Sequence, residues 1–129
     1  MIVYKVIRKH SRRSACIQGP MSLVYSKGKW IKPVISDAPI MAFRHEHQAE
    51  LFAQVLEVET PKLTVIRCEA VKSRRRLFPT LLIAGVLVAG KPTVQRCRKM
   101  WAPRNQKELP WLLRAYHGTV LCSALKPLE

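Results

Sequence analysis

Basic side chains are the groups in this sequence best suited to chemistry with a partner. Lysine and arginine number 23 against 8 aspartates and glutamates, which gives a net charge of +15. Guanidinium groups can bind two phosphate oxygens at once, and ammonium groups attract phosphate as point charges. The composition therefore indicates a polyanion partner, either nucleic acid (RNA or DNA) or an acidic protein surface.

The charge is also segregated along the chain. Residues 1–36 hold eight basic residues and no acid, and residues 70–107 hold ten and no acid. Five of the eight acids lie between Glu46 and Glu69. We expect one face of the protein to be near neutral and another to be strongly positive, although a solvated surface that serves only solubility remains an alternative.

Tryptophans lie within or beside the basic stretches, at positions 30, 101 and 111. Single-stranded nucleic acid is bound by this combination, in which cations attract the backbone and aromatic rings stack on bases. The usual fate of tryptophan is core packing, and no sequence-reading motif such as a helix-turn-helix is present. The predicted nucleic-acid-binding residues are Arg12, Arg13, Lys72, Arg74, Arg75, Arg76, Arg96, Arg98, Lys99 and Trp101.

Acids and histidines offer little for catalysis. Glu46 and Glu50 are spaced one helical turn apart, but acids at a helix start are explained by the helix dipole. His45 and His47 would point apart on a helix, which disfavours a shared metal. The sequence has no P-loop, HExxH or Gly-x-Ser-x-Gly motif. We expect no enzymatic activity, no cofactor and no metal.

Four cysteines are widely spread and lack the two-residue spacing of zinc and redox motifs. They are Cys16, Cys68, Cys97 and Cys122. We expect reduced, buried thiols, with a zinc site built from distant cysteines, joined by His10 or His117, as a lesser alternative. Cys97 lies between two arginines, where the pKa of a thiol can be lowered, and it is the thiol to test for reactivity.

The longest apolar stretch, residues 77–90, has 14 residues and contains Pro79 and Gly85. A membrane-spanning helix needs about 20 residues, so this stretch predicts a core element and no membrane span. The alternating, charged residues 1–9 lack the apolar core of a signal peptide. We expect a cytoplasmic location, in the host cytosol if the protein is viral.

Periodicity predicts several elements. Residues 2–8, 14–25 and 40–43 have strand character, with Gly19-Pro20 as a turn or bulge within the second, and Ser26 to Lys29 is a turn signal. The segment at about 46–57 places Ala49, Phe52, Ala53 and Leu56 on one apolar stripe of a helix.

The second half of the chain is less regular. Residues 63–71 alternate as a strand with even-numbered residues on one face, and 119–125 form a last strand. Residues 77–90 favour a helix or irregular core. The expected fold class is α+β, a compact single domain in which a mostly antiparallel sheet packs with one amphipathic helix. An atypical basic and apolar region covers 74–117.

The order of these pieces resembles small uncharacterised α+β proteins of phages and prokaryotic mobile elements. The likeness covers about two thirds of the chain. It is carried by 4–8, by the turn 25–30, by Ala42 and Phe43 leading into Ala49, Phe52 and Ala53, by 65–71, and by 118–122 with 126–128. The resemblance implies a viral or mobile-element setting and no particular reaction.

These observations favour a non-enzymatic, phage-type accessory protein. It would bind nucleic acid or nucleoprotein through its basic clusters, largely independently of sequence. The alternative is a structural or host-interaction protein that acts through an apolar interface at about 77–111. A homo-oligomer fits either function.

Overall fold

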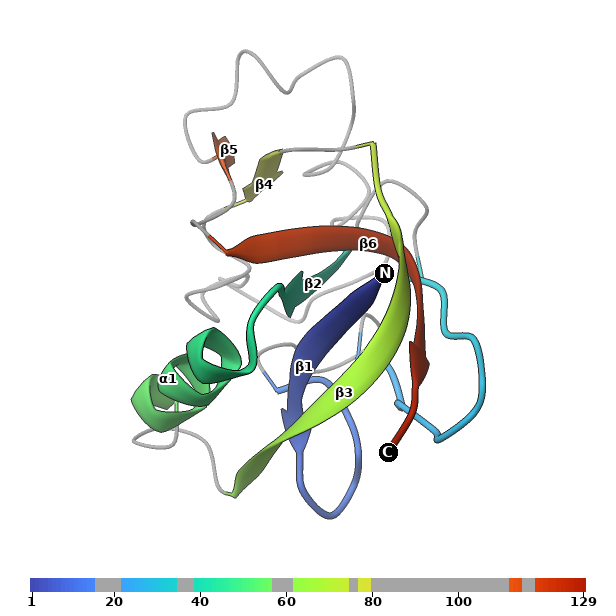
Figure 1. Cartoon of the computed structure of the whole chain (residues 1–129), viewed down its shortest axis with the longest axis vertical. Coiled ribbons are helices and arrows are strands. Elements are labelled where there is room, and N and C mark those ends of the chain that lie inside the picture. The colour runs from blue at the N-terminus through green and yellow to red at the C-terminus, as the bar shows by residue number, and fades with distance from the viewer. Residues whose placement is uncertain (16–21, 35–38, 57–61, 75–76, 80–111, 115–117) are drawn as a thin grey trace, which may run out of the picture.

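Four antiparallel strands close into a barrel in the computed structural model (Figure 1). The strand order is β1 (Ile2–Arg8), β2 (Ile40–Phe43), β6 (Thr119–Pro127), β3 (Leu63–Lys72) and back to β1. The structure describes residues 1–15, 22–34, 39–56, 62–74, 77–79, 112–114 and 118–129. For the described residues, the expected antiparallel sheet with one helix is confirmed, and the structure adds that this sheet closes on itself.

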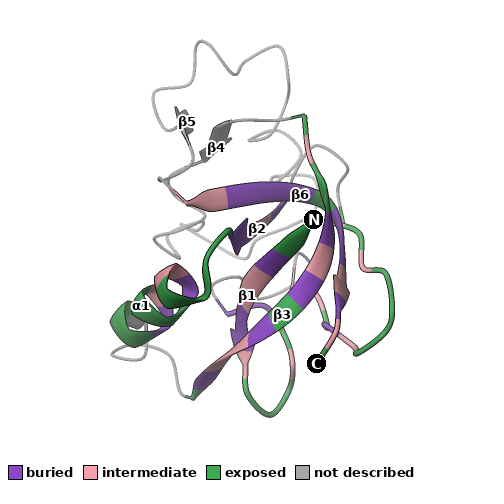
Figure 2. Ribbon diagram, viewed as in Figure 1, coloured by how far each residue is buried: buried purple, intermediate pink, exposed green. Residues whose placement is uncertain are grey.

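The barrel interior is built by strict alternation of side chains. On β1 the residues Val3 and Ile7 face inward, and on β3 the inward residues are Ile66, Cys68 and Ala70. Figure 2 shows the resulting change between buried and less buried positions along both strands. Because side chains of a strand alternate between faces, the predicted division of 63–71 into two faces is confirmed.

A second apolar cluster joins the outside of the barrel to the helix α1 (Glu46–Leu56). Ala49 and Ala53 are buried on α1 and pack against outward residues of the strands such as Val6 and Leu63. The rings of Phe43 and Phe52 lie 5.1 Å apart between centroids. The predicted helix is confirmed, and residue 57 of the predicted range lies outside the described residues.

A tight contact fixes α1 against the start of β6. Gly118 has a φ of +85°, and its carbonyl accepts a 2.7 Å hydrogen bond from the backbone N–H of Arg44. A Cβ at Gly118 would collide with the side-chain amide of Gln48. Only glycine satisfies both the positive φ and this close approach.

The predicted strand at 14–25 has a different structure in its described parts. Its two ends pair with each other, since Ser14 and Leu23 exchange hydrogen bonds of 3.0 Å and the N–H of Tyr25 donates to the carbonyl of Arg12 at 2.8 Å. Ladder pairing there is limited to isolated bridges at Ser14 and Val24. In its described residues the segment therefore does not form the predicted strand, and the turn or bulge expected at Gly19-Pro20 lies outside the described residues.

The start of the apolar stretch 77–90 also differs from the expected helix or irregular core. Leu77–Pro79 forms β4, which pairs antiparallel with β5 (Leu112–Arg114). Proline is tolerated at this position because a two-stranded sheet has only edge strands. Residues 80–90 lie outside the described part of the chain. Among the described residues, no helix has the length and apolar character needed to cross a membrane.

Candidate nucleic-acid interface

Some basic side chains make contacts within the protein that stabilise the fold. Lys5 lies on the inner face of β1, and its ammonium donates a 2.7 Å hydrogen bond to the carbonyl of Met41 and lies 5.5 Å from the ring centroid of Tyr25. β1 and β2 pair at a single register position, Tyr4 with Phe43. The Lys5 side chain therefore bridges two strands that share little backbone pairing.

Arg12 is committed in the same way. Its guanidinium donates to the carbonyl of Tyr25 at 2.8 Å and to the carbonyl of Glu129 at 2.6 Å. The residue has a φ of +57°, in the left-handed region that non-glycine residues rarely adopt. The structure thus places this predicted nucleic-acid-binding residue between two chain segments, which its guanidinium connects through two hydrogen bonds to backbone carbonyls.

The acids on the outer face of the barrel are neutralised locally. Glu69 lies 3.1 Å from the ammonium of Lys126, and Glu129 lies 3.9 Å from the guanidinium of Arg67. Four acids fall within the described residues, and the other two, Glu46 and Glu50, belong to α1. The acids of β3 and the C-terminal segment are therefore already matched with cations.

A different set of basic side chains is exposed and makes no hydrogen bond or ion pair with the described residues. Its members are Lys9, Arg13, Lys27, Lys29, Lys32, Arg44, Lys62, Lys72 and Arg74. Their charges are available to a partner without breaking an interaction among the described residues.

Three of these cations lie on residues 26–32, here called the lysine loop. Its turn is closed by a 3.3 Å hydrogen bond from the N–H of Lys29 to the carbonyl of Ser26, with Gly28 at a φ of +77°, so the predicted turn is confirmed. The N–H of Gly28 donates to the carbonyl of Pro127 at 2.8 Å. Ile31 and Leu125 exchange two further backbone bonds, so the loop follows the edge of β6 (Figure 1).

Trp30 projects from this loop and is 48% exposed. The ammonium of Lys126 lies over its ring, 5.1 Å from the centroid, a distance at which a cation is attracted to the aromatic face. Lys126 is itself held by Glu69. The ring is thus a fixed, half-exposed aromatic surface between the exposed lysines 27, 29 and 32.

A second group, here called the barrel-end cluster, consists of Lys9, Arg13 and Lys62. The N–H of Lys9 donates to the carbonyl of Lys62 at 3.0 Å, and the N–H of Arg8 donates to the carbonyl of Arg13 at 2.9 Å. Arg13 also pairs with Val24, three residues before Lys27. The backbone therefore connects the barrel-end cluster directly to the lysine loop.

The predicted site residues are only partly brought together. Arg13 joins the barrel-end cluster, whereas Lys72 and Arg74 lie at the other end of β3 from Lys62. Ten residues of strand correspond to about 30 Å at about 3.3 Å per residue. The remaining predicted residues are Arg75, Arg76, Arg96, Arg98, Lys99 and Trp101, and they lie outside the described residues, as does 80–111 of the alternative apolar interface.

Sequence reasoning noticed Trp30 but did not choose it, and it left out the three lysines of the lysine loop. The usable signal was the run of alternating basic residues at 27, 29 and 32 around a glycine turn. A tight turn places its side chains at the surface, which separates Trp30 from an ordinary core tryptophan.

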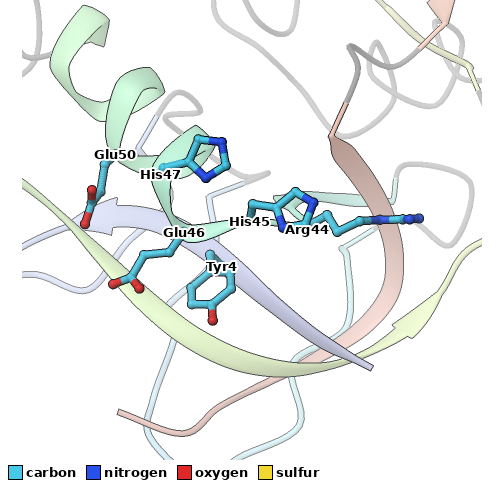
Figure 3. Close-up of a pocket in the computed structure, with 6 residues that line it drawn as sticks. All are labelled: Tyr4, Arg44, His45, Glu46, His47 and Glu50. Carbon is cyan, nitrogen blue, oxygen red and sulfur yellow. The ribbon is translucent and has the colours of Figure 1, made fainter.

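The start of α1 forms an open pocket of about 450 Å³ (Figure 3). It is lined by Tyr4, Arg44, His45, Glu46, His47 and Glu50. In Figure 3 both carboxylates point to one side and both imidazoles to the other, so these groups do not converge on one reacting atom. Among the described residues, no group of three His, Cys, Asp or Glu is placed to hold a metal ion.

The two histidines correct one expectation. Their rings are stacked, with centroids 5.7 Å apart and planes at 21°, whereas the sequence predicted that they point apart. The reason is that His45 precedes the first helical residue, Glu46, so helical spacing does not apply to the pair.

Cys68 and Cys122 are free thiols buried in the barrel, as expected for these two cysteines. Burial raises the pKa of Cys68 to about 12 and the pKa of Cys122 to about 11, while the nearby Lys5 ammonium acts in the opposite direction. Both thiols are protonated at neutral pH and unsuited to nucleophilic chemistry. Cys16 and Cys97 lie outside the described residues.

Comparisons with family models, curated proteins and solved structures found no match to this chain.

Proposed function

We propose that this protein is a non-enzymatic, phage-type accessory protein that binds the phosphate backbone of nucleic acid, largely independently of sequence. The supporting observation is the lysine loop, whose three lysine side chains are exposed and make no bond to the described residues, on a backbone fixed to β6. The barrel-end cluster adds further exposed cations near this loop along the backbone, because Arg13 pairs with Val24.

The electrostatics of this surface support a phosphate partner. Glu69 and Glu129 are the described acids closest in the fold to the lysine loop, and each lies beside a cation of the barrel. Lysines whose side chains make no bond to the described residues can attract phosphates and release their counterions. Binding by counterion release carries no sequence information by itself, which fits a sequence-independent function.

The test is the binding of a labelled 20-nucleotide oligonucleotide at NaCl concentrations from 50 to 300 mM, followed by fluorescence anisotropy. We expect affinity to fall steeply with salt. The triple variant K27A/K29A/K32A should reduce the slope of log affinity against log salt by about 2, because each phosphate bound in a single strand adds about 0.7 to that slope.

Arg44→Ala is the control variant, because the Arg44 side chain is exposed and makes no bond to the described residues but lies beside Glu46 and Glu50 at the α1 pocket. We expect this variant to keep the slope of the wild-type protein. Binding that is absent, or that does not respond to salt, would contradict the proposed function.

A further inference from the structure

We infer that the lysine loop takes single-stranded nucleic acid, with one base stacked on the ring of Trp30. This inference rests on the proposed function and adds the class of strand and the residue that discriminates it.

The ring of Trp30 is held in place before any ligand arrives. Hydrogen bonds from Gly28 to Pro127 and between Ile31 and Leu125 fix the backbone on both sides of it. Ile31 packs against the barrel core, so its neighbour Trp30 projects to the opposite side, where it is 48% exposed. A ring fixed in this way loses little conformational entropy on binding.

The Lys126 ammonium over the ring adds a second feature. Its position, 5.1 Å from the centroid, is maintained by the 3.1 Å ion pair with Glu69. The cation occupies one face of the indole, and the exposed part of the ring is left for a base. Base stacking on an aromatic side chain tolerates every sequence because each base has a π-face.

The order of side chains along the loop matches a single strand. Exposed lysines at 29 and 32 flank the aromatic ring, and a strand likewise presents a base between consecutive phosphates. In a duplex the bases are already paired and stacked, so none is free for Trp30 unless it is flipped out, which costs a few kcal/mol. The lysines alone serve single and double strands, whereas the ring serves single strands.

The experiment compares three labelled ligands of equal length: oligo(dT), a duplex, and a strand of abasic sites that keeps the phosphates. Proteins are the wild type, Trp30→Ala and Trp30→Phe, with thermal melts to verify folding. We expect Trp30→Ala to weaken oligo(dT) binding roughly 5- to 100-fold, the range for loss of one base stack. Duplex and abasic-strand affinities should change less than about 2-fold, and Trp30→Phe should retain most of the oligo(dT) affinity.

The inference fails if Trp30→Ala weakens oligo(dT) and duplex equally, or weakens neither, while both bind with the expected salt dependence; the proposed function then stands. If the wild type binds no nucleic acid at all, the proposed function fails as well. A wild type that binds polyglutamate as tightly as oligo(dT) would assign the surface to an acidic protein and overturn the inference.

Discussion

Two basic regions of this protein use the same kind of side chain in opposite ways. Where β1 and β2 pair at a single register position, the Lys5 ammonium is directed to the Met41 carbonyl and the Tyr25 ring. On the lysine loop, the side chains of Lys27, Lys29 and Lys32 are exposed and make no hydrogen bond or ion pair with the described residues. In the first region the cation connects two strands of the barrel, and in the second region the cations are exposed to a partner.

The difference between the two regions shows that net charge alone overestimates the number of cations that can bind a partner. Lys5, Arg12, Arg67 and Lys126 all contact other groups of the protein. A cation whose donors are occupied by backbone carbonyls still contributes to the field around the protein, but it gains little from a phosphate contact. The useful quantity is the number of free cations on one continuous surface.

The largest expected effect concerns the barrel interior around Lys5, where two buried thiols should make the free energy of unfolding depend on alkaline pH. The pKa of Cys68 is raised to about 12 and that of Cys122 to about 11, from an ordinary value of 9.0, chiefly by burial. The folded protein therefore binds more protons than the unfolded chain above pH 9. The two buried, protonated thiols contribute fully to stability below pH 9, and their contribution is lost as pH rises toward 11 and 12.

The free energy of unfolding should fall in this window by up to about 1.4 kcal/mol per pH unit for each thiol. The measurement is urea unfolding under reducing conditions at pH 8, 9 and 10. The double variant C68A/C122A is the control, because it removes the thiols and leaves the lysines that also titrate. Equal pH slopes for the two proteins would show that the interior is open to water.

A smaller effect tests whether the Lys5 side chain stabilises the fold. Lys5→Met keeps an unbranched apolar stem of similar length and removes the donor to the Met41 carbonyl. We expect the free energy of unfolding at pH 7 to fall by about 1–2 kcal/mol, a typical value for a partly buried bond to a charged group. Oligonucleotide affinity should change less than about 2-fold.

Lys9→Met is the matched control, since the Lys9 side chain is exposed and has no described partner. Its stability should stay within about 0.5 kcal/mol of the wild type. If the two variants are equally stable, Lys5 does not serve the fold.

Local periodicity was sufficient to predict most of the described elements. The alternation in β1, β3 and β6 and the stripe of Ala49 and Ala53 on α1 are properties of neighbouring residues, and they survive into the structure. Closure of the barrel was not predictable in this way, because it depends on pairing between distant strands such as β2 with β6. The pairing of Ser14 with Leu23 at the two ends of 14–25 was likewise not predictable from local periodicity.

The candidate site was less predictable for a related reason. Arg12 and Arg13 are adjacent and chemically identical in the sequence, yet the left-handed backbone at Arg12 turns its side chain to Tyr25 and Glu129. Lys72 and Arg74 are separated from Arg13 by the length of β3, which only the register of β1 with β3 reveals. A basic cluster in sequence therefore does not specify a basic cluster in space.

The adjacent pair Arg12 and Arg13 gives the smallest and most discriminating test of the comparison, because both variants lose one positive charge. Arg12→Ala removes two hydrogen bonds to backbone carbonyls, and we expect the free energy of unfolding to fall by about 1 kcal/mol with an unchanged salt slope for oligo(dT) binding. Arg13→Ala should leave stability within about 0.5 kcal/mol and reduce the salt slope by about 0.7, the value for one phosphate contact. Urea unfolding and anisotropy titrations on the same preparations measure both quantities. Identical behaviour of the two variants would mean that charge acts here without regard to contacts, and the distinction between committed and free cations would be wrong.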